Sequence, residues 1–225
     1  MRVIIAMLAA IAALATLAMG MGFPVDLHLA RAFYDPAQGR FLASINPYVG
    51  LVRDNGLVAI ITCASAMIAA LVTRMLRRPS RALPGRVVFF LISTLLLGPG
   101  LIVNLGLKDH WHRPRPVQVT EFGGAKPYVD WWNPRGGCER NCSFVSGEVS
   151  SAAWMFAPAM LASPQWRVAA FAGAAIFTAV ISLSRMAAGG HFFTDVLFAV
   201  LLMTILILIM HRVIFRRRRI AAVTA

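Results

Sequence analysis

The sequence has few charged residues, and acidic residues are especially scarce. Only 14% of its 225 residues are charged, whereas a typical soluble domain has about 25%. Nine Asp and Glu stand against 22 Lys and Arg, so the formal net charge is +13. In a soluble protein this excess would indicate nucleic-acid binding, but 59% of the residues are hydrophobic. We therefore predict no nucleic-acid partner, and the hydrophobicity also excludes a disordered chain.

Cysteine is scarce as well, with three residues in the chain. Cys138 and Cys142 lie close together in one polar segment, where they are suited to a disulfide on an oxidising side of a membrane. A zinc site needs about four ligands, and the nearest histidines, His110 and His112, lack the usual spacing. We therefore favour a disulfide over a metal site, with two free thiols as a third alternative.

Long apolar runs occupy most of the chain. Six of them carry no charge, and most reach the ~17–25 residues that a helix needs to cross a membrane. They cover residues 3–20, 57–73, 87–107, 149–166, 168–184 and 196–210. We predict an all-α integral membrane protein with six transmembrane helices, forming one domain over residues 1–225. The first run could instead be a signal peptide, but it is longer than the usual apolar region of ~7–15 residues.

Two of these runs have further features. The last run, 196–210, is short unless its helix begins near His191 and continues through Phe215. Asp195 would then lie in the first turns of this helix. Pro158 lies inside the fourth run, where a proline kinks a helix without excluding a membrane span.

The arginines set the expected orientation. The segments on one side of the predicted spans contain no acidic residue, whereas all nine Asp and Glu fall on the other side. By the positive-inside rule, the arginine-rich side is cytoplasmic and the mixed side faces outward. The arginines assigned to the cytoplasmic side are Arg2, Arg74, Arg77, Arg78, Arg81, Arg86, Arg167, Arg212 and Arg216 to Arg219.

Two segments on the outer side are long. We expect residues 21–56 to cover the membrane surface, with a short interfacial helix, and we assign them no chemistry. Residues 108–143 are rich in histidine, arginine, tryptophan, proline and glycine. We expect Trp111, Trp131 and Trp132 to form an aromatic belt at the level of the lipid headgroups.

Polar residues gather at the outer ends of the predicted helices. Each one alone has an ordinary role, because cationic side chains extend to the interface and Ser-Gly can begin a helix. Together they place cations, helix-start amides and a His/Asp pair at one level of the membrane, which suits the binding of an anion. The set comprises Lys108, Arg115-Pro116, Ser146-Gly147-Glu148, Ser184-Arg185, His191 and Asp195.

This set resembles the motifs of the type-2 phosphatidic acid phosphatase superfamily, the lipid phosphate phosphatases. The family pattern is K-x6-R-P, then P-S-G-H, then S-R-x5-H-x3-D. The first and third motifs are complete here, at 108–116 and 184–195, whereas Val145 and Glu148 replace the proline and the histidine of the second. The segments 121–124 and 141–144 look most like the bacterial lipid A phosphatase branch.

The resemblance implies a lipid phosphatase in a bacterial inner membrane, with its active site facing the periplasm. His191 would be the nucleophile that forms a phosphohistidine, Asp195 would fix the imidazole tautomer, and Glu148 stands where the family carries its proton donor. No carboxylate cage for Mg²⁺ is visible, so we expect no metal or other cofactor. The residues expected to bind phosphate are Lys108, Arg115, Ser146, Gly147 and Arg185, and further candidates for proton transfer are His110 and His112.

The expected partners are a lipid phosphate substrate and membrane lipids, and lipid A phosphate is the favoured substrate. Undecaprenyl diphosphate and phosphatidylglycerophosphate are alternative substrates, and a lipid phosphotransferase would use the same residues. A catalytically silent protein that binds or transports lipid headgroups is the alternative from another class, since Glu148 departs from the family pattern. No pattern in the sequence indicates an oligomeric state.

Overall fold

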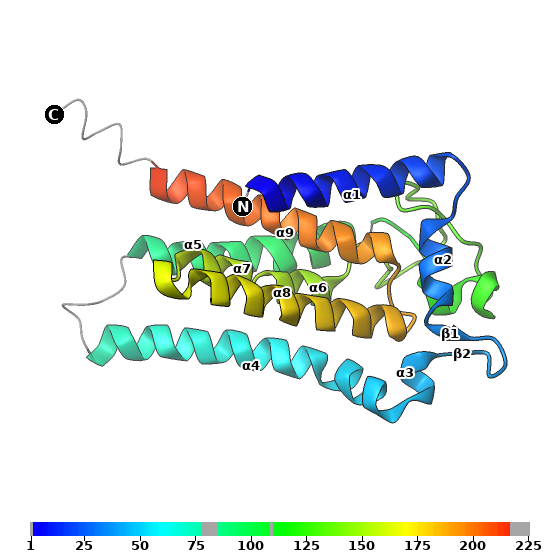
Figure 1. Ribbon diagram of the computed structural model, residues 1–225, viewed down its shortest axis with the longest axis horizontal. Coiled ribbons are helices and arrows are strands. Elements are labelled where there is room, and N and C mark those ends of the chain that lie inside the picture. Colours follow the sequence, from blue (N-terminus) through cyan, green and yellow to red (C-terminus); the bar gives the residue numbers. More distant parts are fainter. Residues whose placement is uncertain (1, 78–84, 109, 217–225) are drawn as a thin grey trace.

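The computed structural model describes residues 2–77, 85–108 and 110–216, and the chain is mostly helical in this part (Figure 1). Arg78, Arg81 and Arg217 to Arg219, which were assigned to the cytoplasmic side, lie outside the described residues. A short antiparallel hairpin pairs β1 (Tyr34–Asp35) with β2 (Arg40–Phe41). The principal helices are α1 (Arg2–Gly20), α2 (Val25–Arg31), α3 (Leu42–Ile45), α4 (Pro47–Arg77), α5 (Gly85–Leu95), η2 (Leu96–Leu107), α6 (Gly147–Ala153), α7 (Phe156–Leu161), α8 (Pro164–Ala187) and α9 (Phe193–Arg216).

Four helical segments of the described residues are long and apolar enough to cross a membrane. They are Pro47–Ala66, Gly85–Leu107, Pro164–Ala187 and Phe193–Phe215. A fifth is added if Ala9–Gly20 and Val25–Arg31, which are bent by 100° relative to each other, form one broken span. The protein is therefore a multi-pass membrane protein, and its described residues contain four to five candidate spans. The six transmembrane helices that the sequence predicted are not all found as continuous helices among these residues.

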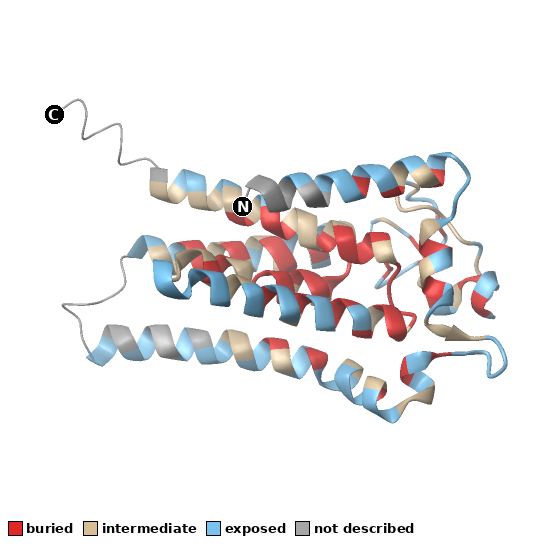
Figure 2. Ribbon diagram, in the orientation of Figure 1, coloured by how far each residue is buried: buried red, intermediate tan, exposed pale blue. Residues whose placement is uncertain are grey.

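The fourth apolar run, 149–166, does not form the single span that was predicted. Instead, α6 and α7 are separated by a turn at Trp154 and Met155. Pro158 explains this break, because it has no N–H to donate and its ring clashes with the carbonyl of Trp154, four residues earlier. The N–H of Ala157 bonds that carbonyl instead, at 2.8 Å. The kink expected from Pro158 is thus confirmed, and it divides a segment whose side chains are largely buried (Figure 2).

The helix of the second apolar run also differs from its prediction. It begins at Pro47, ten residues before the predicted start at Leu57. The Asn46 side chain accepts hydrogen bonds from the N–H groups of Tyr48 and Val49, at 2.9 and 3.3 Å, so an Asn-Pro pair starts the helix. The hydropathy pattern missed this first part because it contains the polar residues 53–55.

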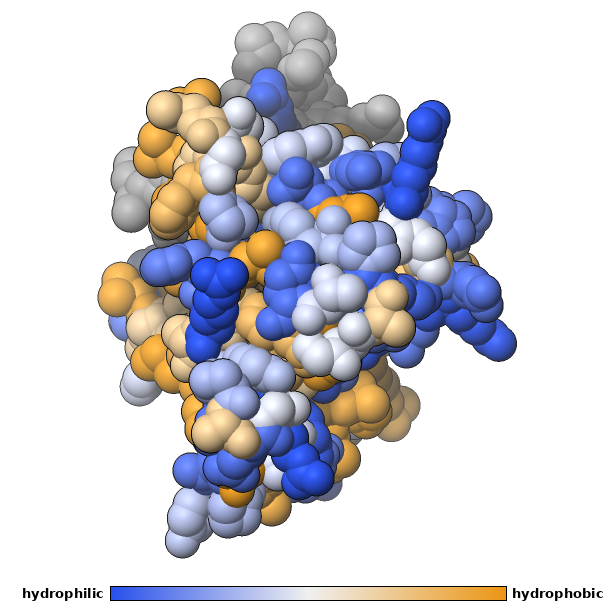
Figure 3. Space-filling model, turned by 90° about the vertical axis from the view of Figure 1, so that its right-hand side faces the viewer, coloured by the Kyte–Doolittle hydropathy of each residue, from blue (hydrophilic) through white to orange (hydrophobic). Residues whose placement is uncertain are grey.

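The two long loop segments meet at one end of the helical bundle. Figure 1 shows α2, the β-hairpin and the α8–α9 turn at this end, whereas the start of α5 and the ends of α4 and α9 lie at the other. Hydrophilic residues spread over the surface of the loop end, and hydrophobic residues are more frequent toward its sides (Figure 3). As predicted, α9 continues through Phe215, with His191 just before its first turn. The predicted site residues therefore lie at the end that carries the long loops.

Gly189 holds the α8–α9 turn close to its neighbours, and replacing it should destabilise the protein. Its φ is +63°, and an added Cβ would lie 2.5 Å from Phe41 Cδ2 and 2.6 Å from Val117 Cγ1. We expect Gly189→Ala to lower the free energy of unfolding by about 1–3 kcal/mol, through backbone strain and overpacking. Thermal unfolding of the detergent-solubilised protein measures this. Gly173→Ala is the matched control: it lies in α8 with no described heavy atom within 4 Å of an added Cβ, and it should be neutral or stabilising.

Candidate active site

The polar residues at the loop end converge on the N-terminus of α6. Ser146 caps this helix through its side chain, which accepts the N–H of Val149. The N–H of Ser146 donates to the Asp195 carbonyl at 3.3 Å and so joins α6 to α9. A Cβ on Gly147 would lie 3.3 Å from Lys108 Nζ, so the lysine ammonium lies beside the helix start. The motifs separated in the sequence thus meet at one place.

His191 is the buried centre of this group, with 3% of its surface exposed. Its Nδ1 lies 2.8 Å from the carbonyl oxygen of Ser143. A carbonyl only accepts hydrogen bonds, so Nδ1 carries the proton and Nε2 keeps its lone pair. Burial lowers the pKa of His191 well below its usual value, and the charges of Arg115, Arg185 and Lys108 lower it further. His191 is therefore a neutral imidazole among three cations.

The structure corrects the expected contact between Asp195 and His191. Asp195 Oδ2 is 4.0 Å from His191 Nδ1, and it accepts the Ser143 hydroxyl at 2.5 Å and the Phe192 N–H at 2.8 Å. The carbonyl of the same Ser143 fixes the imidazole tautomer. Asp195 therefore reaches His191 through Ser143, a residue to which the sequence analysis gave no role.

Arg113 and Asp26, which the sequence analysis left without a function, form a buried ionic cluster with Asp195. Arg113 donates to Asp195 Oδ1 and to Asp26 Oδ2, at 2.6 Å each, and all three side chains are 0% exposed. Thr194 accepts from Arg113 and donates its hydroxyl and its N–H to Asp26. Burial disfavours the charged form of Arg113, but the carboxylates of Asp195 and Asp26 outweigh it and raise the pKa of Arg113. The segment 21–56, to which we assigned no chemistry, thus supplies a carboxylate to the site.

Arg115 is held by a small disulfide-closed loop. Its Nε and Nη2 donate to the carbonyl of Asn141, at 3.1 and 2.9 Å. The structure joins Cys138 and Cys142 by the expected disulfide, with Cα atoms 5.8 Å apart. Burial, and then the charge of Arg185, lower the pKa of Arg115. Since an arginine pKa starts far above neutrality, the guanidinium stays charged.

Arg185 and Glu148 form the remaining polar pair. Arg185 Nη1 lies 3.4 Å from Glu148 Oε1, and both side chains are partly exposed. In the described part of the chain, Arg185 Nε and Glu148 Oε2 have no hydrogen-bond partner although both atoms are buried. One N–H donor of Arg185 and one carboxylate oxygen of Glu148 can therefore form hydrogen bonds with a bound ligand.

The loop histidines lie apart from these contacts. His112 Nδ1 is bonded to the Cys138 carbonyl at 2.7 Å, and His110 is exposed. Their role in proton transfer stays a prediction. Among the described residues, no group of three or more His, Cys, Asp or Glu side chains is arranged to hold a metal ion.

The three tryptophans for which a belt was predicted differ in their packing. Trp111 stacks on Phe144, with ring centroids 4.8 Å apart, and Trp131 packs against Phe198 at 4.2 Å. Both indoles are part of the packing around the core, and Trp132 is 40% exposed. Because Trp111 and Trp131 also stay partly exposed, their place at the level of the lipid headgroups stays a prediction.

Comparison with known proteins places most of the site within one family. Residues 86–219 match the PAP2 superfamily. The chain belongs to this superfamily. Its three motif segments, from Lys108 to Asp195, all lie within the matched part, whereas Asp26 precedes it. The PAP2 motifs therefore could not have revealed that Asp26 is a counter-ion of Arg113.

Two relatives with named activities extend this comparison. The chain is 31% identical to the lipid A 4'-phosphatase of Francisella tularensis subsp. novicida over 198 residues, which are 87% of this chain and 89% of the relative. It is 42% identical to the lipid A 4'-phosphatase of Rhizobium leguminosarum over 105 residues, which are 47% of this chain and 45% of the relative. No solved structure matches the chain.

The Arg113 cluster gives a prediction for stability. Arg113→Gln removes the charge that compensates two buried carboxylates, so we expect the free energy of unfolding to fall by about 3–5 kcal/mol. Chemical unfolding in detergent measures the loss. Adding Asp26→Asn to Arg113→Gln should recover part of the loss, because one unpaired buried charge then disappears. Arg53→Gln is the control, since its ion pair with Asp54 is at the surface and should leave stability almost unchanged. Equal effects of Arg113→Gln and Arg53→Gln would contradict the assigned importance of the cluster.

Proposed function

We propose that the protein is a membrane lipid phosphatase that removes a phosphate from lipid A. The observation that carries the proposal is the buried neutral His191 with Lys108, Arg115 and Arg185 around it. This arrangement pairs a nucleophile with three charges suited to a phosphate dianion. The relatives named lipid A 4'-phosphatase support lipid A as the substrate.

Phosphate binding is proposed for the three cations together with the start of α6. The guanidinium groups of Arg115 and Arg185 suit bidentate contacts with phosphate oxygens, and Arg185 Nε is a donor without a described partner. Lys108 adds a third charge beside Gly147. Ser146 and Gly147 complete the proposed set at the helix start.

The reaction is proposed to proceed in two displacements. The lone pair on His191 Nε2 attacks phosphorus, the bond from phosphorus to the lipid oxygen breaks, and that oxygen takes up a proton. Water then attacks the phosphohistidine, releases inorganic phosphate and returns the electron pair to Nε2. Asp195 is a positioning residue here, because it holds Ser143, whose carbonyl holds Nδ1–H.

Glu148 is proposed to give the proton to the departing lipid oxygen. Its Oε1 is held by a long contact of 3.4 Å to Arg185, and its Oε2 has no partner among the described residues. A bound phosphate dianion competes for Arg185 and so frees the Glu148 carboxyl group to face the departing lipid oxygen. The alternative is a structural role in which Glu148 only orients Arg185.

We further propose that the site faces the periplasm from the bacterial inner membrane. Arg77, Arg86 and Arg212 lie toward the end of the bundle opposite the site (Figure 1). The positive-inside rule therefore assigns the site end to the outer side, and the disulfide suits an oxidising compartment. A phosphotransferase that passes the phosphoryl group to a second lipid would use the same residues.

Replacing the nucleophile tests the proposed reaction. His191→Ala should lower phosphate release from lipid A by several orders of magnitude with the thermal midpoint retained, and Asp195→Asn should be impaired less. Inorganic phosphate is measured with detergent-solubilised protein and a panel containing lipid A, undecaprenyl diphosphate and phosphatidylglycerophosphate. EDTA should leave the rate unchanged. If His191→Ala kept a tenth of the wild-type rate, the phosphohistidine mechanism would be rejected. If the wild type released phosphate from none of these lipids, the phosphatase function would be rejected.

Glu148→Gln separates the two roles of this carboxylate. If Glu148 is the proton donor, the rate on a lipid phosphate monoester should fall by about 10²–10⁴. The loss should be smaller on a diphosphate, whose leaving phosphate needs little protonation. Steady-state rates on both substrates measure the difference. An unchanged rate on the monoester would reject the acid role and direct attention to His110, His112 or water.

A further inference from the structure

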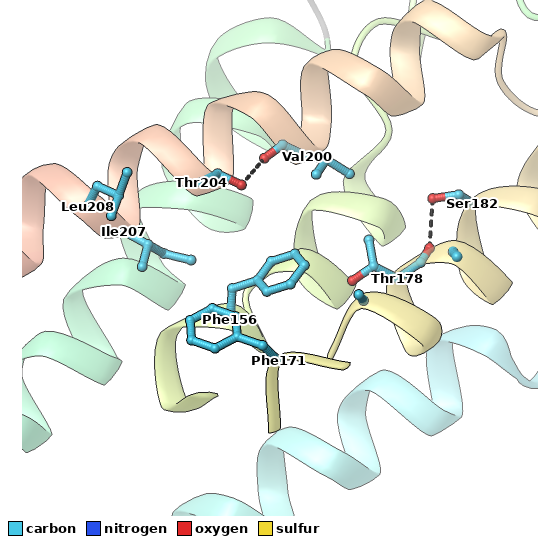
Figure 4. A pocket seen from close by; sticks show the side chains of 10 residues that line it. Phe156, Phe171, Thr178, Ser182, Val200, Thr204, Ile207 and Leu208 are labelled. Atoms are coloured by element: carbon cyan, nitrogen blue, oxygen red, sulfur yellow. Dashed lines mark hydrogen bonds between the residues drawn. The ribbon is translucent and has the colours of Figure 1, made fainter. Parts of the chain in front are cut away.

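A pocket lies between α8 and α9, deeper in the bundle than His191. Its volume is about 290 Å³. Both helices pack against α6 and α7, and Phe156 of α7 lines the pocket from below (Figure 4). The complete lining consists of Phe156, Phe171, Ala175, Thr178, Ala179, Ser182, Val200, Thr204, Ile207 and Leu208.

The chemistry of the lining favours an apolar occupant. Its three hydroxyl groups belong to Thr178, Ser182 and Thr204, and each donates at 2.7 Å to a carbonyl four residues earlier in its own helix. Figure 4 shows two of these bonds. The hydroxyl protons are therefore already used, and the other lining side chains are hydrocarbon. A polar ligand would lose its hydration here without gaining equivalent hydrogen bonds.

The residues that line the pocket are neighbours of the active-site residues along α8 and α9. Ser182 precedes Arg185 by three residues on α8, which is about 4.5 Å along a helix, and Phe171 precedes it by about 21 Å. On α9, Val200 follows Asp195 by five residues and Leu208 lies two turns further. Both helices are candidate membrane spans. The lining thus extends from just below the catalytic groups into the apolar part of the bundle.

We propose that this pocket receives an acyl chain of the lipid whose phosphate is bound at His191; this inference rests on the proposed phosphatase function. An apolar cavity of about 150 Å³ admits one benzene molecule, so the pocket holds a chain segment on the order of ten carbon atoms. The rings of Phe156 and Phe171 stack 6.1 Å apart, and Phe171 is the lining residue of α8 that lies farthest from Arg185. These rings limit the length of chain that the pocket accepts.

The test compares two substrates that share a phosphorylated headgroup. One carries long acyl chains, and the other carries chains too short to pass Ser182. Ala175→Phe fills the pocket and should lower kcat/KM for the long-chain substrate at least tenfold, while the short-chain rate stays within twofold. Ala169→Phe is the matched control, because Ala169 is exposed on the same helix and does not line the pocket; it should resemble the wild type on both substrates.

The outcomes separate this inference from the proposed function. No phosphate release by the wild type from either substrate would reject the phosphatase function. If the wild type releases phosphate and Ala175→Phe slows this release equally for both substrates, or for neither, the acyl-chain site is rejected and the phosphatase function is not. Phe156→Ala should shift the preference toward longer chains, and an unchanged preference would reject its role in limiting the chain length.

A direct binding measurement adds a readout that does not depend on turnover. A lipid phosphate with a photoreactive group in its acyl chain is irradiated with His191→Ala, and the labelled peptides are mapped. Labelling within residues 171–182 and 200–208 is expected. Labelling elsewhere, or equal labelling by the same lipid without its phosphate, would overturn the proposal, since the occupant would then not be the substrate chain.

Discussion

The fully buried guanidinium of Arg113 is the constraint on which the active site depends. A charge without solvent is costly unless its partners are close and its donors are used. Arg113 meets this condition through Val129, Thr194, Asp26 and Asp195. These partners come from a loop, from α2 and from α9. The hydrogen bonds of the one Arg113 side chain therefore fix three separate segments relative to each other.

The consequence for catalysis passes along a chain of hydrogen bonds. Arg113 holds Asp195, Asp195 holds the Ser143 hydroxyl, and the Ser143 carbonyl holds the His191 imidazole. The cations that surround the imidazole attract an anion, whereas the buried carboxylates lie behind it. The proposed nucleophile thus has three cations as its charged neighbours, and it is joined to the buried Arg113 cluster through Ser143.

The sequence predicted those parts of the fold that local patterns determine. The runs 87–107, 168–184 and 196–210 correspond to α5 with η2, α8 and α9, because hydrophobicity over a helical length is sufficient for a span. It failed where a polar stretch belonged to a helix, at the start of α4, and where Pro158 divided an apolar run. Hydropathy registers neither case, since it reports composition rather than backbone hydrogen bonding.

For the site, motif spacing predicted which residues would meet but not how they are held. The contact between Arg113 and Asp26 joins residues 87 positions apart, and Asp26 lies before the part that matches the family. The sequence does not distinguish a buried arginine from an arginine at a membrane surface. Ser143 acts through its backbone carbonyl as well as its hydroxyl, and a carbonyl belongs to every residue. Such roles become visible only when the chain is folded.

The disulfide loop gives the proposed phosphate-binding site a rigidity that its charges alone would not. The ring closed by Cys138 and Cys142 restricts the backbone that presents the Asn141 carbonyl to Arg115 and the Cys138 carbonyl to His112. The N–H of Cys142 also donates to the carbonyl of Lys108. The segments that carry Lys108 and Arg115 are therefore both bonded to one short covalent ring. Such a ring has few alternative conformations, so it loses little conformational entropy when a ligand binds. A phosphate dianion at the proposed site would meet a preorganised environment, and little of its binding energy would be spent on arranging the loop.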